Sequence, residues 1–289
     1  MIQVRLKTRH VPWGWSILKI TKSMLRGKKR MIRGLYTAVS GMIVQENKQN
    51  VIANNIANAE TVGFKSDNLI AKSFKDVMMI NHDKGTSSGS QKVQLGTMSL
   101  GSSVAGVYSD FSQGTIKETG NDTDFAIIGN GFFKVSRESN GMTEEYYTRD
   151  GNFQVNIQGY LVNNYGDYVL DKNSNKIYVG DGKITANENG DLSIENSNGT
   201  VNNYSLAVVD FEDYTALNKV GDNLYSGEGA IDINATVQHK SVEGSNINIM
   251  NEMVNLMSVM RDFESNQTLI QTIDESLGKV INTVGSVRG

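Results

Sequence analysis

The sequence contains no cysteine and a single proline among its 289 residues. A chain without cysteine has no disulfide, no thiolate zinc site, no iron–sulfur cluster and no thiol nucleophile. This composition suits a protein that is exported unfolded, because no thiol can be misoxidised outside the cell. No stretch after residue 30 approaches the roughly 18 consecutive apolar residues of a transmembrane helix, so none is predicted.

Basic residues are scarce outside the start of the chain. Residues 1–30 hold nine Lys or Arg and no acidic residue. Subtracting these nine charges from the net charge of −3 leaves −12 for residues 31–289. An acidic body argues against nucleic acid as a partner, because phosphate binding requires a basic surface.

Residues 1–30 also differ from the rest in composition, since they hold the only proline and both tryptophans. Lys19 and Lys22 interrupt the short apolar run, and no small-residue cleavage site precedes Met31, so a secretory signal is disfavoured. A basic arm that touches a membrane or nucleic acid is a second interpretation. A regular pattern that begins at Met31 favours a third, in which residues 1–30 are a basic extension that is not native.

A heptad pattern occupies residues 241–289 and predicts a long C-terminal helix. Its positions alternate in steps of four and three over about five heptads. Ser245 and Asn248 are candidate N-caps, and Gly285 is a candidate stop. Such a helix cannot cover its own apolar seam, so a partner is expected. The apolar seam positions are Ile249, Met253, Leu256, Met260, Phe263, Ile270, Leu277, Ile281 and Val284.

Residues 31–66 carry a shorter pattern of the same type, which predicts an N-terminal helix. Asparagine is a poor residue inside a helix, so the helix should end near Asn58, and Gly63 should break the chain before Phe64. The Asn-rich end either satisfies backbone groups at a bend, contacts other subunits, or is simply a frayed terminus. The seam positions are Leu35, Val39, Met42, Glu46, Gln49, Ala53 and Ile56.

Between the two helices the apolar pattern changes to a period of two, and Asn-Gly and Asp-Gly turns separate short segments. Residues 111–240 are therefore predicted to form a β-rich body. Residues 67–110, rich in Gly and Ser, are predicted to be an irregular excursion. The fold class is α+β, with terminal α-helices pairing into a coiled-coil-like stem and a central antiparallel all-β body. Predicted strands are 124–129, 132–135, 144–148, 152–156, 160–163, 168–171, 176–179, 183–186, 191–195 and 204–211.

Four segments carry more specific patterns. The first fits N-N-I-A-N-x-x-T-x-G-F-K, with Asn54, Asn55, Ile56, Ala57, Asn58, Thr61, Gly63, Phe64 and Lys65. Together with residues 111–135, 147–170 and 242–266, it resembles the signature blocks of the flagellar rod and hook protein family, in the family's order. The resemblance implies export through the flagellar type III channel without a cleaved signal, and it makes residues 31–66 an expected export and assembly segment. It also implies helical assembly, with both terminal helices forming an inner tube.

The resemblance implies a structural subunit of the basal-body rod, the drive shaft that links motor to hook. Its implied partners are copies of itself, adjacent rod and hook subunits and the export apparatus, with no cofactor or small-molecule substrate. A length of 259 residues from Met31 suits the rod, and the Gly/Ser stretch favours the distal rod, whereas residues 260–264 are closer to a proximal-rod relative. We prefer the distal rod. The expected assembly interface comprises Leu35, Val39, Met42, Asn54, Asn55, Ile56, Asn58, Gly63, Phe64, Ile249, Met253, Leu256, Met260, Phe263, Ile270, Leu277, Ile281 and Val284.

Motifs typical of enzymes and metal sites have simpler explanations here. Residues 85–89 fit G-x-S-x-G but lie in a Ser/Gly run rather than between a strand and a helix. His10, His82 and His239 lack ligand spacing. No catalytic, cofactor or metal site is therefore expected. The alternatives left open are a flagellar hook-type protein, a secreted β-rich adhesive or binding protein whose helices trimerise, and a carbohydrate- or peptide-acting enzyme.

Overall fold

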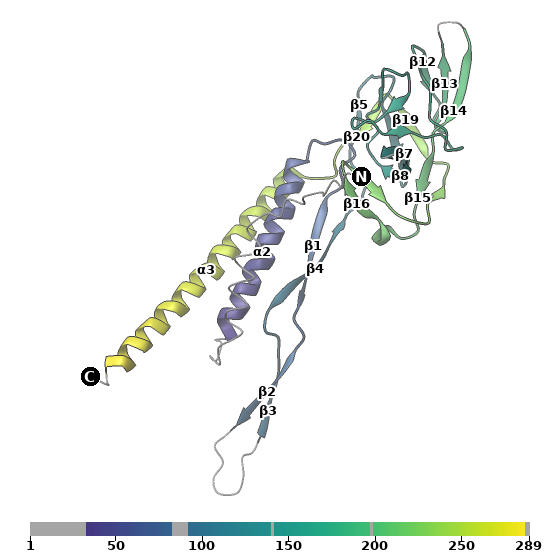
Figure 1. The fold of residues 1–289 in the computed structure, drawn as a ribbon. Coiled ribbons are helices and arrows are strands. Elements are labelled where there is room, and N and C mark those ends of the chain that lie inside the picture. The colour runs from purple at the N-terminus through teal and green to yellow at the C-terminus, as the bar shows by residue number, and fades with distance from the viewer. Residues whose placement is uncertain (1–32, 83–91, 140–141, 197–198, 287–289) are drawn as a thin grey trace, which may run out of the picture.

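The computed structural model describes residues 33–82, 92–139, 142–196 and 199–286. The described chain forms a helical stem, a long β arm beside it and a β body at one end of both (Figure 1). The predicted extension at 1–30 and the G-x-S-x-G motif at 85–89 lie outside the described residues.

The stem consists of α2 (Arg33–Ala57) and α3 (Ile249–Ser286), which pack side by side. Both predicted helices are confirmed. The side-chain Oδ1 of Asn248 accepts a hydrogen bond from the Asn251 amide at 3.2 Å, so Asn248 is the N-cap of α3. Ser245 accepts instead from the Ile247 amide at 3.3 Å and forms a turn before the helix.

The arm consists of β1 (Asp67–Ser73), β2 (Val77–His82), β3 (Lys92–Met98) and β4 (Ser102–Ser109). β1 pairs with β4 and β2 with β3, both antiparallel. The predicted irregular excursion at 67–110 is therefore wrong where the structure describes it. A two-stranded ribbon forms its ladder from backbone groups and leaves most side chains exposed, so it needs no alternation of apolar and polar residues.

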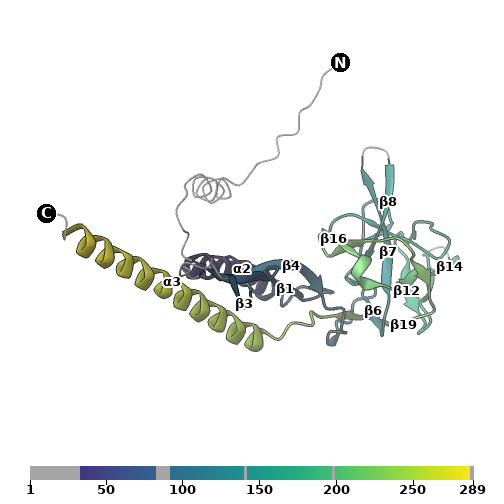
Figure 2. The same ribbon diagram turned by 90° about the horizontal axis from the view of Figure 1, so that it is seen from below.

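The arm lies along α2, so that α2 is flanked by the arm and by α3 (Figure 2). The rings of Tyr36 and Phe74 lie 6.2 Å apart. The Ser40 hydroxyl accepts from the Ser102 amide at 3.3 Å, and the Thr37 hydroxyl donates to the Leu100 carbonyl at 3.2 Å. These contacts fix the position of the arm along α2.

The body is built from short antiparallel strands, as predicted. The largest sheet runs in the order β16-β17-β8-β7-β11-β10-β9. Strand β15 pairs with β7 and also with β18, which joins both to this sheet. A second sheet has the order β12-β13-β14, and the pairs β6–β19 and β5–β20 complete the body. The elements are β5 (Ile116–Glu118), β6 (Phe125–Ile128), β7 (Phe132–Ser139), β8 (Met142–Thr148), β9 (Gln154–Val155), β10 (Leu161–Val162), β11 (Tyr168–Val169), β12 (Lys183–Ala186), β13 (Asp191–Glu195), β14 (Val201–Ser205), β15 (Val208–Asp210), the 3₁₀ turn η1 (Tyr214–Ala216), β16 (Asn218–Gly221), β17 (Leu224–Ser226), β18 (Ile231–Asp232), β19 (Thr236–His239) and β20 (Ser241–Glu243).

Some predicted strands differ from the observed ones. Residues 176–179 make only isolated bridges, from Lys176 to Leu170 and from Tyr178 to Tyr160. The predicted strand 204–211 is divided between β14 and β15, because the chain changes sheets near Leu206. Strand β5 and strands β16 to β20 were not predicted, since segments of two to four residues are too short to show a period.

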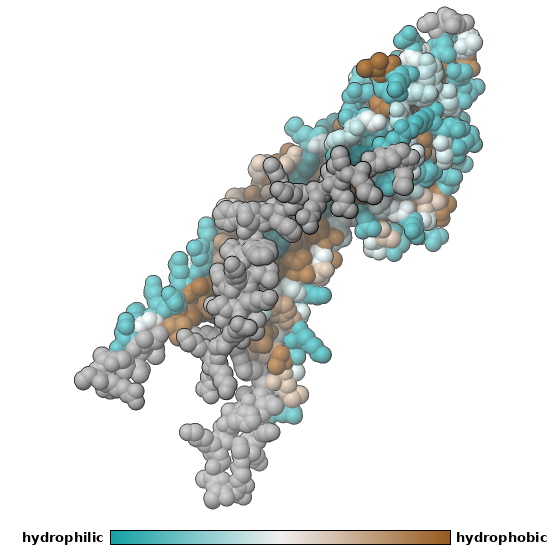
Figure 3. Space-filling model, in the orientation of Figure 1, coloured by the Kyte–Doolittle hydropathy of each residue, from teal (hydrophilic) through white to brown (hydrophobic). Residues whose placement is uncertain are grey.

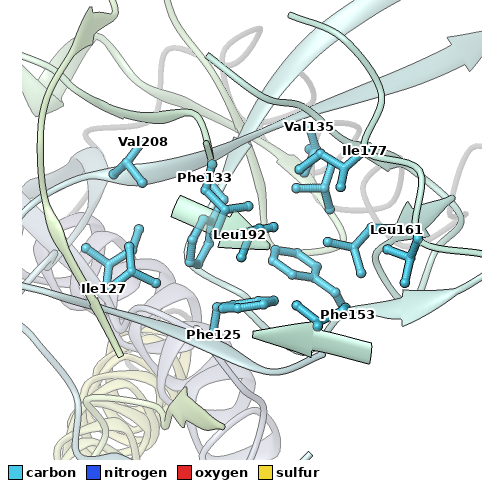
Figure 4. Close-up of a cluster of buried hydrophobic side chains, with 14 of the residues drawn as sticks. Phe125, Ile127, Phe133, Val135, Phe153, Leu161, Ile177, Leu192 and Val208 are labelled. Atoms are coloured by element: carbon cyan, nitrogen blue, oxygen red, sulfur yellow. The ribbon is translucent and has the colours of Figure 1, made fainter. Parts of the chain in front are cut away.

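The core of the body lies on both faces of β7. Phe133 joins the larger cluster with Phe125, Phe153 and Leu161 (Figure 4). Its neighbour Phe132 points to the opposite face and joins a second cluster, which includes Tyr147, Phe211 and Tyr225. Successive side chains of a strand point to opposite faces, so two adjacent buried Phe residues require cover on both sides of the sheet.

Candidate assembly surfaces and the joint between stem and body

The face of α3 toward α2 follows a regular spacing of three and four residues. Val259 is buried on this face. A Cβ placed on Gly41 of α2 would lie 3.5 Å from the side-chain nitrogen Nδ2 of Asn266. Gly41 therefore lies on the face of α2 that packs against α3, with room for a methyl group. The buried and half-buried positions are Leu256, Val259, Phe263, Asn266, Ile270, Ile273 and Leu277.

A second apolar row on α3 is exposed. It comprises Met250, Met253, Val254, Met257 and Met260, which are 44–71% exposed and which we call the methionine row. Hydrophobic surface is visible along the stem in Figure 3. Met253 and Met260, predicted as seam positions, thus lie outside the contact with α2, as does the exposed Ile249.

Tyr36, Val39 and Ile43 form an exposed apolar row on α2. A groove of about 380 Å³ runs beside them, between α2 and β4, and we call it the α2–β4 groove. It is lined by Tyr36, Val39, Ser40, Ile43, Asn47, Phe74, Ser102, Ser103 and Val104.

The predicted interface residues divide into three groups. Val39, Asn54, Ile249, Met253 and Met260 are exposed. A second group, from the helix seams and the end of α2, is half-buried. The third group, Asn55, Gly63 and Phe64, is buried within the single subunit. The side chains of Ile281 and Val284 lie outside the described part. The half-buried group is Leu35, Met42, Ile56, Asn58, Leu256, Phe263, Ile270 and Leu277.

The buried residues lie where the stem meets the body. Asn55 donates to the Asp67 carbonyl at 2.9 Å and accepts from the Asp67 amide at 3.0 Å. Gly63 has φ +67°, and a Cβ there would lie 2.4 Å from the Asp150 backbone nitrogen. Of the interpretations of the Asn-rich end, Asn55 therefore fits the one in which it satisfies backbone groups at a bend.

A buried ion cluster lies in the same region. Lys65 Nζ is 2.6 Å from Glu243 Oε1, and Arg149 Nη1 is 3.2 Å from Glu243 Oε2. The three side chains are at most 2% exposed. Burial lowers the pKa of Lys65, while the hydrogen bond to Glu243 acts in the opposite direction. Sequence reasoning did not select Arg149 or Glu243, although both lie in segments that carry the family resemblance.

Three family models match the chain. "Flagella basal body rod protein" matches residues 35–65, "Flagellar hook protein FlgE/F/G D1 domain" residues 126–203, and "Flagellar basal body rod FlgEFG protein C-terminal" residues 238–283. The flagellar basal-body rod protein FlgG of Buchnera aphidicola subsp. Baizongia pistaciae is 32% identical over 269 residues, covering 86% of this chain and 99% of that protein. The chain belongs to the flagellar basal-body rod protein family.

Further relatives of this rod-family protein include proteins named FlgG and proteins named FlgF. FlgG of Bacillus subtilis is 31% identical over 274 residues, covering 87% of this chain and 99% of that protein. FlgF of Caulobacter vibrioides is 30% identical over 263 residues, covering 89% and 100%. The protein is thus a structural subunit of the flagellar basal-body rod, as its resemblance implied.

The region where stem meets body brings together the N-terminal and C-terminal family matches of this rod-family protein. Lys65 is the last residue of the N-terminal match, and Glu243 lies within the C-terminal match. In the described parts of the chain, no three His, Cys, Asp or Glu side chains are grouped so as to hold a metal ion. His239 Nε2 donates a hydrogen bond to the Asp122 carbonyl at 2.8 Å, and its ring stacks on Phe125. Neither described helix is long and apolar enough to cross a membrane.

Proposed function

We propose that this rod subunit polymerises with copies of itself through its terminal helices, and that it catalyses no reaction. The observation that carries the proposal is the methionine row, because the opposite side of α3 already packs on α2. A row of large exposed apolar side chains is typical of a protein–protein interface. Methionine adapts well to such surfaces, since its side chain is flexible and polarisable. The structural role of the family supports the absence of an enzymatic role.

A growing rod needs contacts between two different surfaces of neighbouring subunits. A contact between identical surfaces closes a dimer, whereas a heterologous contact continues along a helix. The stem offers two distinct apolar surfaces, the methionine row and the row of Tyr36, Val39 and Ile43 beside the α2–β4 groove. These surfaces are separate on one subunit, which supports heterologous assembly.

The predicted interface residues take different parts in this proposal. The exposed Val39, Asn54, Ile249, Met253 and Met260 contact neighbouring copies. The half-buried seam residues hold α2 against α3 so that both rows face outward, and Asn55, Gly63 and Phe64 position the stem on the body. Ile281 and Val284 are assigned to the same seam by the heptad spacing of the sequence alone.

We further propose that adjacent rod and hook subunits and the flagellar export apparatus are partners. The distal rod is the preferred position, because the arm occupies much of the stretch that favoured this position in the sequence. A proximal-rod position is the alternative, because residues 260–264 are closer to a proximal-rod relative. A hook-type role is supported by the family model for the hook protein D1 domain at residues 126–203.

The double variant Met253→Glu, Met257→Glu tests the proposal in the full chain. Two negatively charged carboxylates on the methionine row should prevent docking without disturbing the contact with α2. We expect folded, exported protein in non-motile cells whose basal bodies, viewed by electron microscopy, lack a complete rod. Gln271→Glu, an exposed change on the same helix, is the matched control and should leave motility intact.

Normal rods in the double variant would contradict assembly through the methionine row. A strain that lacks the gene but builds a full-length rod and hook would contradict the rod function itself. A stable, discrete trimer of the purified protein would favour the adhesive or binding alternative.

A further inference from the structure

We infer that the joint between stem and body is rigid in the single subunit, and that Glu243 is the positioning residue that makes it so. The chain passes between the stem–arm unit and the body at residues 110–115 and 244–248. The turn after α2, residues 58–66, packs against both passages. We define the joint as these three segments together with Glu243 and Arg149.

Glu243 contacts every part of the joint. Its Oε1 accepts from Lys65 Nζ at 2.6 Å and from the Gly114 amide at 2.8 Å. Its Oε2 accepts from Arg149 Nη1 at 3.2 Å, and its backbone carbonyl accepts from the Gly63 amide at 2.7 Å. One residue therefore ties the turn after α2 and the passage at 110–115 to the body.

Further hydrogen bonds join the same segments. The Asn246 side chain accepts from the Ser66 amide at 2.9 Å and donates to the Asp110 carbonyl at 2.8 Å. Lys65 Nζ donates to the Ser112 carbonyl at 2.8 Å. The backbones are in close contact, since a Cβ on Gly114 would lie 2.0 Å from the Gly244 carbonyl oxygen. Bonds in several directions leave the joint little freedom to bend.

The charges of the cluster make the joint depend on Glu243. Two buried cations, Lys65 and Arg149, share this single carboxylate. If the carboxylate is removed, both cations remain buried without a counter-charge, and they repel each other. Water that enters the joint relieves this cost, as does loss of the Lys65 proton, which also breaks its charged hydrogen bonds. The main core of the body lies in a separate cluster around Phe125 and Phe133, so it can persist while the joint opens.

The distance between a spin label on the stem and one on the body reports how freely the two move relative to each other. The chain has no cysteine, so Ser258→Cys on α3 and Glu188→Cys in the body give unique attachment points, and both positions are exposed. Pulsed electron paramagnetic resonance on the full-length monomer should give one narrow distance distribution. Adding Glu243→Gln should abolish the narrow distribution. Adding Lys65→Met to Glu243→Gln should restore much of it, because only one buried cation is left.

Glu138→Gln is the matched control, since it removes the surface ion pair with Lys176 and should leave the distribution narrow. A broad distribution in the labelled parent would overturn the inference, as would an unchanged narrow one after Glu243→Gln. If Glu243→Gln alone fails to fold, the double variant decides. If the double variant folds and gives a narrow distance distribution, the inference is supported. If the double variant also fails to fold, Glu243 serves overall stability instead, and the inference is overturned. The measurement uses monomers, so its outcome is independent of rod assembly.

Discussion

The stem and the body of this rod protein differ in how much apolar surface each covers by itself. The body encloses Phe125, Phe132, Phe133 and Phe153 completely, on both faces of one sheet. The stem buries one face of α3 against α2 and leaves the methionine row exposed. A region that covers its own core is stable alone, whereas a helix pair with an exposed apolar row gains stability from a neighbour. The difference divides the protein into a self-sufficient body and a stem suited to assembly.

The sharpest test of this comparison is a cavity in the body. Phe133→Ala removes a fully buried ring that packs edge-on against the Phe153 ring, with 5.3 Å between the ring centroids. Truncation of a buried phenylalanine costs about 3–5 kcal/mol, so the midpoint of urea unfolding should fall sharply. Met257→Ala, on the exposed row, should change the free energy of unfolding of the monomer by less than about 0.5 kcal/mol. Equal losses for the two variants would break the distinction between body and stem.

A second test concerns a buried charge in the body. Burial raises the pKa of Asp150 to about 6. The folded chain therefore holds this proton more tightly than the unfolded chain, and the resulting stability is lost as the pH rises from about 4 through 6. At pH 7 the penalty is about 3 kcal/mol, at roughly 1.36 kcal/mol per pKa unit. Asp150→Asn should therefore stabilise the protein at pH 7 by up to this amount and have little effect at pH 4.

Urea unfolding of Asp150→Asn at both pH values measures this difference. An asparagine oxygen can still accept the bond that the Asn152 amide donates to Asp150 at 2.9 Å. Asp181→Asn, at an exposed position of the same body, should show no such pH dependence. A gain of equal size at pH 4 and pH 7 would show that removal of the buried charge is not its cause.

The smallest expected effect lies in the stem. Val259→Ala removes two methyl groups from the buried face of α3, a loss of about 1.5 kcal/mol at ~0.8 kcal/mol per group. Hydrogen exchange should accelerate in α2 and α3 while β13 of the body keeps its protection. Ser265→Ala, at an exposed position of α3, is the control. Faster exchange throughout the body would mean that the stem and body unfold as one unit.

Local patterns in the sequence determined much of the fold. The heptad spacing predicted both helices, and Asn248 was one of two candidate caps, because capping depends on a few adjacent residues. Apolar alternation and Asn-Gly or Asp-Gly turns predicted the antiparallel body. The family blocks predicted a rod protein, which the relatives confirm. Each of these signals lies within a short stretch of chain.

Only the tertiary structure decided which apolar positions of α3 meet α2. Apolar residues cover more than one side of this helix, so periodicity alone did not separate the buried Val259 from the exposed Met253 and Met260. The arm was missed because backbone pairing holds its exposed strands together. The partners Lys65 and Glu243 are 178 residues apart, and their attraction exists only where folding excludes water and brings them to 2.6 Å. Such contacts leave no local pattern, because burial and proximity are properties of the folded chain.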